Sequence, residues 1–486
     1  MKRFLCLLLV LFSCCSFVVG NNKYQNVHSI ETVLDNGVSV IVDERFELVC
    51  IAFRLAGAEE YLNGNSPIYL NQVDAFFSAF KEHRLISFIK NIRESYNFAY
   101  SIVAKSSLMI ELRGGHVVIS SEWDFNKEFS SEYESCWNES IFRQYVNLLD
   151  SFYRSSHFHS FFVSHIPFFE QTVQSCSEVP QHLDRNWFQE FYGIPLIGVN
   201  LILGLSIGPN NYSIHDVRRK KGWDGRLTIM IGTKEGVSDI PSISDENLPV
   251  IIHEICHYYS YPIVEQYYNE MENAMSIVYS RVKNKMAVIG YGNAHDVTGE
   301  WINELFTNCY LEQNASFGCM YNVARDEEIG YIWMRRALLF MHNFSRNRDI
   351  YPTINDFMPQ LSAFTRELVA KWDHIQKEFD DRHPYVVDVF PAGGILQLTT
   401  KEIRVSFSTP MMTGISGVLQ LKGYEPLHCA FSACRWEDDR TFVINLENVP
   451  LLGGTTYGIK LPSYAFINAQ YFSLANDLDL VFYVVD

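Results

Sequence analysis

Residues 248–259 have the sequence Leu-Pro-Val-Ile-Ile-His-Glu-Ile-Cys-His-Tyr-Tyr, and this stretch decides how the rest of the chain is interpreted. Two histidines at positions i and i+4 of a helix lie one above the other on the same face. His253 and His257 can therefore approach one Zn²⁺ ion at roughly 2.0–2.1 Å. Glu254 follows the first histidine, where a carboxylate can accept a proton from a water molecule activated by a metal. The stretch predicts a helix that carries two metal ligands and a catalytic base.

The helix is expected without the motif. Asp245 or Asn247 is placed to cap its start, and Pro262 is placed to end it. Apolar side chains surround the histidines and would exclude water from the site: Val250, Ile251, Ile252 and Ile255. The alternative interpretation is a chance match, with two histidines on an ordinary helix surface.

A zinc ion that activates water needs a third protein ligand. Residues 299–308, Gly-Glu-Trp-Ile-Asn-Glu-Leu-Phe-Thr-Asn, predict a second amphipathic helix in which Glu304 is the candidate ligand. Asn308 stands one turn later, where its amide can hydrogen-bond a histidine ligand and fix its tautomer. A lone Asn-Glu pair on a solvated helix face is the alternative, although the apolar neighbours of Glu304 favour a buried position.

A hydrolase of this kind also needs a hydrogen-bond donor for the oxyanion. Tyr291 and His295 precede the helix of Glu304, and Tyr331 follows it. His295 and Tyr331 are taken as the candidate catalytic donors. A purely structural role is the alternative for each of them.

The motif His-Glu-Ile-Cys-His, followed by Trp-Ile-Asn-Glu-Leu-Phe-Thr-Asn in a helix, resembles the gluzincin zinc peptidases. The resemblance implies Zn²⁺ as the cofactor, His253, His257 and Glu304 as its ligands, and Glu254 as the base. The 46 residues between His257 and Glu304 exceed the usual gluzincin spacing and indicate an inserted helix over 263–282. Asn308 occupies a position where many relatives have an acidic residue.

Longer segments resemble a bacterial exported family known only as a domain of unknown function (4932). The resemblance covers about residues 28–380 and implies a metallopeptidase without a known substrate. It is carried by four segments: 42–61, 187–193, 253–267 and 351–361. The segments 387–394 and 403–412 resemble the opening strands of a bacterial Ig-like domain.

Hydrophobic periodicity predicts an α+β protein. Strand patterns occupy 27–55, 195–203 and 227–231, and helical spacing dominates the segments between them up to about residue 380. From residue 383 onward, short alternating strands predict an all-β sandwich. The predicted domains are a signal peptide (1–20), a helix-rich gluzincin-like metallopeptidase domain with a small mixed sheet (21–382), and an Ig-like β-sandwich (383–486).

The N-terminus is typical of an export signal. Lys2 and Arg3 precede an apolar run from Phe4 to Phe12, and small residues stand before Asn21. A lipoprotein signal that anchors the chain at Cys14 is the competing interpretation. Both place the protein outside the cytoplasm, in the periplasm, on the cell surface or in the medium.

Composition limits the class of partner. The chain of 486 residues has a formal net charge of −17, which would repel a phosphate backbone and excludes nucleic acid as the expected partner.

Eight cysteines follow the signal, and the pairs Cys309/Cys319 and Cys429/Cys434 are close enough in sequence to form disulfides in an oxidising compartment. Buried thiols are the alternative for each cysteine.

Taken together, the sequence predicts an exported, Zn²⁺-dependent hydrolase that acts on peptide or protein substrates. The Ig-like domain would contact a cell surface or glycan. One alternative is a non-catalytic extracellular binding protein that retains a zinc-site scaffold. Another is an adhesin in which the Ig-like domain carries the function.

Overall fold

The computed structural model describes residues 26–96, 98–123, 138–214, 226–236, 239–314, 318–428 and 434–485. The predicted export signal and Cys14 lie outside these ranges. The chain forms two compact units, the first of Met1–Asn186 with Pro195–Tyr258 and the second of Trp187–Ile194 with Tyr259–Asp486. Within the described ranges, no helix combines the length and apolar character needed to span a membrane. The fold class is α+β, as the sequence predicts.

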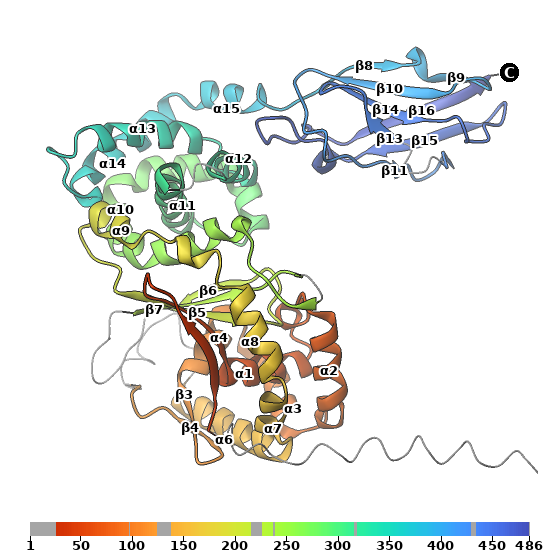
Figure 1. Cartoon of the computed structure of the whole chain (residues 1–486). Coiled ribbons are helices and arrows are strands. Elements are labelled where there is room, and N and C mark those ends of the chain that lie inside the picture. Colours follow the sequence, from red (N-terminus) through yellow and green to blue (C-terminus); the bar gives the residue numbers. More distant parts are fainter. Residues whose placement is uncertain are drawn as a thin grey trace, which may run out of the picture. The chain divides into compact units, whose positions relative to one another are not determined.

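The first unit is built on a five-stranded mixed sheet in the order β1-β2-β5-β7-β6 (Figure 1). β2, β5 and β7 pair in parallel, whereas β1 and β6 pair antiparallel to their neighbours. The strands are β1 Ser29–Val33, β2 Val38–Asp43, β5 Gly198–Gly204, β6 Asn211–Ile214 and β7 Arg226–Gly232. Gly37, in the turn between β1 and β2, has a φ of 79°, which a side chain would disfavour. Every residue of β2 is buried, as expected for a central strand.

Seven helices and one hairpin complete the described part of this unit, and α1 and α8 both pack on β2 (Figure 1). They are α1 Glu44–Leu55, α2 Pro67–Phe77, α3 Arg84–Tyr96, α4 Tyr100–Leu108, α6 Glu139–Ser155, α7 Phe158–Ser164 and α8 Ile166–Ser175, with the hairpin β3 Ile110–Arg113 and β4 His116–Ile119.

The predicted continuation of the strand pattern to Leu55 is wrong. The Asp43 carboxylate accepts a hydrogen bond from the backbone N–H of Arg45 at 2.8 Å and so caps a helix. Phe46, Val49 and Phe53 are then buried at a spacing of three and four residues, which is the helical period.

Helix α10 runs from Leu248 to Val288 and contains the histidine motif in its second and third turns. A short 3-10 turn, Asp245–Asn247, precedes it, with a reciprocal hydrogen-bonded cap between Ser244 and Asn247. The predicted end at Pro262 is wrong, and the predicted separate helix over 263–282 is the continuation of α10. Pro262 is exposed, and the stripe of buried side chains continues beyond it at helical spacing: Val264, Met271, Met275, Val278 and Val282. Packing of this stripe stabilises the helix enough to offset the hydrogen bond that proline cannot donate.

In the second unit, helices surround a central helix, α11 (Ala294–Asn314). Every residue of α11 from Val297 to Leu311 is buried except Glu300. The surrounding helices are α9 Arg185–Tyr192, α12 Cys319–Ile329, α13 Met334–Arg346, α14 Ile354–Ala370 and α15 Trp372–Asp380. Between Val297 and Leu311, the partly exposed Glu300 carboxylate marks the place where α11 meets solvent.

After α15, the second unit continues into strands that form two sheets, ordered β13-β14-β10-β8 and β11-β15-β16-β9, with β12 beside β15. One cluster of buried side chains draws on both sheets, including Val405 and Phe442 from the first and Ile459 and Phe482 from the second. The strands are β8 Val386–Phe390, β9 Ile395–Gln397, β10 Glu402–Phe407, β11 Leu419–Gln420, β12 Glu425–Pro426, β13 Cys434–Trp436, β14 Thr441–Asn445, β15 Thr456–Leu461 and β16 Leu478–Val485.

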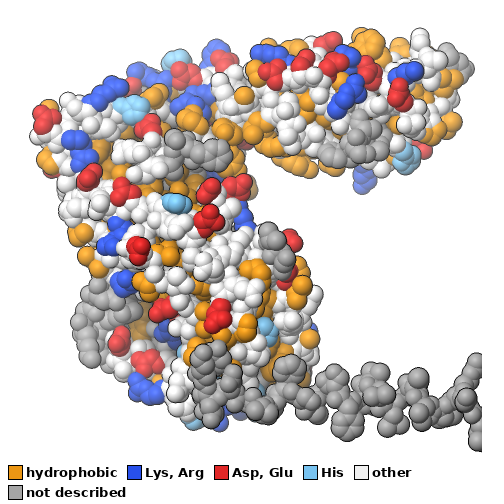
Figure 2. Space-filling view, in the orientation of Figure 1, with side chains coloured by type: hydrophobic (Ala, Val, Ile, Leu, Met, Phe, Trp, Pro, Cys, Tyr) orange, Lys and Arg blue, Asp and Glu red, His pale blue; other side chains and the backbone are white. Residues whose placement is uncertain are grey.

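The change from helix to strand lies between Asp380 and Val386, beside the predicted limit at residues 382 and 383. The compact units divide elsewhere, within α10, so the two predicted limits between the three domains remain predictions. On the face drawn in Figure 2, acidic and basic side chains alternate over the strand-rich region. Ion pairs in this region, such as Arg404 with Glu437 at 2.6 Å, join side chains of opposite charge.

Candidate metal centre

The two histidines of α10 converge as their spacing predicts. Their Nε2 atoms lie 2.9 Å apart, and their ring planes are nearly perpendicular, with centroids 4.5 Å apart. His257 is buried and His253 is half-buried, so solvent reaches the pair from one side. Two imidazole nitrogens that point at each other can share one proton, or they can bind the same cation.

Contacts within the first unit hold this part of α10 on the sheet. The Ser213 hydroxyl on β6 donates a hydrogen bond of 2.8 Å to the backbone carbonyl of Glu254. Ile252 and Ile255 on α10 are fully buried. The Glu254 side chain is only 8% exposed, and a carboxylate in such surroundings has less competition from bulk water for a proton.

Contacts within the second unit hold α11 against the turn of α10 that follows His257. The Ser260 hydroxyl donates to Asn303 Oδ1 at 2.7 Å, and both side chains are fully buried. The Tyr261 hydroxyl donates to Glu300 Oε1 at 3.2 Å. Tyr291 also hydrogen-bonds Glu300, and burial together with that carboxylate raises the pKa of Tyr291 well above its usual range. Two phenols therefore orient the Glu300 carboxylate.

The first unit thus supplies two imidazoles, those of His253 and His257, and the second unit supplies two carboxylates on α11, those of Glu300 and Glu304. Two imidazoles and one carboxylate are the donor set of many catalytic zinc sites, which leave the fourth position to water. The phenols on Glu300 supply the outer hydrogen bonds that such ligands usually have. The residues therefore fit a zinc ion.

Glu304 is the ligand predicted from the sequence. It lies one turn after Glu300 on α11, is 7% exposed, and its Oε1 accepts a hydrogen bond from Arg325 at 3.2 Å. Arg325 also contacts Asp326 at 3.1 Å. Burial and the charge of Glu304 raise the pKa of Asp326. Glu304 is thus part of an ion-pair network, whereas Glu300 is hydrogen-bonded by two phenols.

The predicted role of Asn308 in orienting a histidine is not what the structure shows. Its Nδ2 donates to Asp326 Oδ2 at 2.7 Å, and its Oδ1 accepts from Asn322 at 2.9 Å. Both ends of the amide are therefore used within the ion-pair network. Of the two alternatives for Cys309 and Cys319, the structure has buried thiols and no disulfide between them, and the Cys319 thiol donates to the Asn308 carbonyl at 3.7 Å. Cys429 lies outside the described residues.

The two candidate oxyanion donors have different surroundings. His295 is half exposed, and its Nε2 lies 2.9 Å from a Glu265 carboxylate oxygen. Tyr331 is 1% exposed, and its hydroxyl has no hydrogen-bond partner among the described residues. Burial, followed by the charges of Tyr291, Glu300 and Glu304, raises the pKa of Tyr331 well above its usual range. Tyr331 is thus a neutral donor beside the Glu300 carboxylate.

Sequence reasoning missed Glu300, Tyr261 and the hydrogen bond from Tyr291. One signal for Glu300 was present, because it stands four residues before Glu304 and therefore on the same helix face. The Asn-Glu pattern instead selected Glu304, the later of the two carboxylates, as the candidate ligand.

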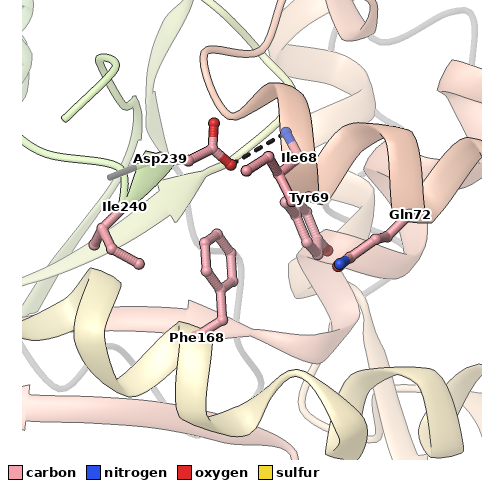
Figure 3. Close-up of a pocket in the computed structure, with 6 residues that line it drawn as sticks. All are labelled: Ile68, Tyr69, Gln72, Phe168, Asp239 and Ile240. Carbon is pink, nitrogen blue, oxygen red and sulfur yellow. Dashed lines mark hydrogen bonds between the residues drawn. The ribbon is translucent and has the colours of Figure 1, made fainter. Parts of the chain in front are cut away.

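A separate pocket of about 180 Å³ opens in the first unit between α2, α8 and the segment of Asp239 and Ile240 (Figure 3). The Tyr69 and Phe168 rings stack at 5.1 Å on its wall, and Asp239 accepts the backbone N–H of Ile68. The hydroxyl of Tyr69 donates at 2.6 Å to Glu47, which is fully buried. Burial raises the pKa of the Glu47 carboxyl to about 7.

Glu47 is expected to make stability depend on pH. At a pH below the pKa of Glu47 in the unfolded chain, the carboxyl is protonated in both the folded and the unfolded state and does not affect stability. Above about pH 7 the carboxyl is ionised in both states, and burial of its charge destabilises the folded state. Stability should fall by about 3 kcal/mol between these limits. Glu47→Gln should flatten this part of the profile in urea unfolding from pH 4.5 to 8. A Glu31→Gln control on exposed β1 should retain the slope, and an unchanged slope in Glu47→Gln would contradict the assignment.

The described elements define an α+β protein with two histidines of one long helix beside a mixed sheet. Residues 38–364 match the family described as a domain of unknown function (DUF4932), and the chain belongs to that family. No curated protein matches the chain. A solved structure, the N-terminal part of the bacterial S-layer protein SbsC, aligns with 12% identity over 48% of this chain and 58% of that chain, with a TM-score of 0.15.

Proposed function

We propose that this protein is a zinc-dependent peptidase. The observation that carries the proposal is the convergence of the His253 and His257 Nε2 atoms, 2.9 Å apart on one face of α10, with Glu254 next to the first histidine. Zinc bound there would polarise a peptide carbonyl and lower the pKa of a water molecule to about 7. Glu304 is the proposed third ligand from the sequence resemblance, and Glu300, one turn earlier on the same face of α11, is the alternative carboxylate.

The chain's own residues supply the proton transfers. Glu254 accepts a proton from the attacking water and then donates it to the leaving amine, so it ends each cycle in its starting form. The neutral phenol of Tyr331 is the best candidate to donate a hydrogen bond to the oxyanion, since its hydroxyl has no other described partner. His295, which is paired with Glu265, is the weaker candidate.

Strand β6 supports a peptide as the substrate. It is the last strand of the sheet among the described residues, and Ser213 connects it to the motif helix at Glu254. An edge strand offers backbone N–H and C=O groups to an extended chain, which is a common mode of peptide binding. A peptide paired with β6 would run beside the turn of α10 that carries Glu254.

Metal dependence tests the proposal. The purified chain should contain zinc, cleave members of a peptide library, lose activity on chelation and regain it when Zn²⁺ is restored. His257→Ala should abolish both zinc retention at α10 and cleavage, while exposed His342→Ala should change neither. Zinc binding without cleavage of any library member would instead support the non-catalytic binding protein.

We also propose, from the sequence, that the protein acts outside the cytoplasm. The proposal rests on residues 1–20 as an export signal, with Cys14 as the alternative lipid anchor. The strand-rich region after Val386 is proposed as an Ig-like module that contacts a cell surface or glycan. Two sheets with one shared core are the architecture that such a module requires.

A further inference from the structure

A second group of side chains of the kinds that bind metals lies in the first unit, away from the histidine motif of α10. His28 precedes β1, Glu44 is the first residue of α1, and His159 lies on α7. The Nδ1 of His28 is 2.6 Å from Glu44 Oε2, and the Nδ1 of His159 is 3.0 and 3.1 Å from the two carboxylate oxygens. Three segments far apart in the sequence thus meet at one carboxylate.

The Glu44 side chain is completely buried, and a buried carboxylate requires compensating positive charge or several hydrogen bonds. Its Oε1 also accepts the hydroxyl of Tyr153 at 3.1 Å. The Tyr153 hydroxyl fixes the carboxylate, as outer hydrogen bonds commonly do for metal ligands. Two neutral imidazoles would supply hydrogen bonds but no charge.

Both histidines present the same ring nitrogen to Glu44, and their ring centroids lie 5.0 Å apart. All three ligand atoms lie within 4.8 Å of one another. Ligands at roughly 2.0–2.2 Å from a tetrahedral zinc are about 3.3 Å apart, so side-chain shifts of about an ångström or less would admit the ion. His28, with 35% of its side chain exposed, leaves a route for water to the fourth position.

We propose that His28, Glu44 and His159 bind a second Zn²⁺ ion, which fastens the segment before β1 to α1 and α7. The ion neutralises the buried carboxylate and replaces the two direct contacts between histidine and glutamate. The site is independent of the proposed peptidase activity, since it uses none of the residues of α10 or α11. Its role is structural.

Zinc stoichiometry in the full chain tests this proposal. The double variant His253→Ala/His257→Ala, dialysed against excess Zn²⁺ and then against buffer, should retain about one equivalent by mass spectrometry. Adding His28→Ala and His159→Ala should remove that equivalent, and adding His116→Ala instead should leave it in place. His116 is the matched control because it is an exposed histidine paired with a carboxylate, Asp150, in the same unit.

X-ray absorption of the zinc-loaded double variant provides a second measurement that does not depend on how the larger variant folds. It should show nitrogen and oxygen ligands without sulfur. A folded double variant that retains no zinc would overturn the proposal and leave a metal-free hydrogen-bonded cluster. Zinc retained after loss of His28 and His159, or a spectrum with sulfur ligands from the buried cysteines, would also overturn it.

Discussion

Replacing Glu254 with Gln is expected to lower kcat for peptide hydrolysis by about 10²–10⁴-fold while zinc content stays unchanged. The amide has nearly the same shape as the carboxylate but cannot accept a proton from water. Because Glu254 is only 8% exposed, bulk solvent would not replace it efficiently. The loss should appear in kcat more than in KM, since the side chain acts on the reacting water and not on the ground-state peptide.

Glu270→Gln is the matched control for this measurement, because Glu270 lies on the same helix and is exposed. It should retain full activity and full zinc content. An active Glu254→Gln variant would exclude the proposed base. A variant that loses zinc as well as activity would show that Glu254 supports the metal site and would leave the base unidentified.

The histidine pair could be predicted because its geometry is local. The spacing of His253 and His257 fixes which face of α10 they share, and their nitrogens converge in the structure as that spacing requires. The same holds for the helical spacing predicted between the strand patterns, which is found in α6 over Glu139–Ser155. Hydrophobic periodicity was sufficient for a correct prediction where the prediction depends on a single helix.

The wrong predictions involve choices that tertiary packing makes. Val38 and Val42 alternate as in a strand, but the capping carboxylate of Asp43 turns the chain into α1, and its apolar residues then fit the sheet at helical spacing. Pro262 would end an isolated helix, but the buried stripe beyond it keeps α10 intact. This extension also accounts for the long interval between the two halves of the motif, which the resemblance to gluzincins had assigned to an inserted helix.

The helical spacing of α11 could not decide between Glu300 and Glu304 as the third ligand, because the two carboxylates share a face of the helix and are one turn apart. What separates them is their surroundings: Glu300 alone stays partly exposed and meets Tyr261 and Tyr291, whereas Glu304 is buried beside Arg325. Arginine stabilises the ionised form of Glu304 but competes with a metal for the same oxygens. These partners come from segments that the motif does not include.

Glu300→Gln is therefore expected to weaken zinc binding at α10 by more than about 100-fold, whereas Glu304→Gln should weaken it by about 10-fold or less. An amide is a much poorer zinc ligand than a carboxylate, while the amide oxygen introduced by Glu304→Gln would still accept the hydrogen bond from Arg325. Competition with a chelator of known affinity measures both constants. The His28→Ala/His159→Ala background removes the second proposed site from the measurement.

Glu312→Gln, in the last turns of α11 where the carboxylate pairs with His342, serves as the control and should leave zinc affinity unchanged. A larger loss for Glu304→Gln than for Glu300→Gln would restore the ligand set predicted from the sequence and require Arg325 to release that carboxylate. Comparable losses would mean that both carboxylates reach the ion, since residues one turn apart on a helix lie close enough to share it. No effect from either change would remove α11 from the metal site and leave the two histidines without the third ligand that a catalytic zinc centre needs.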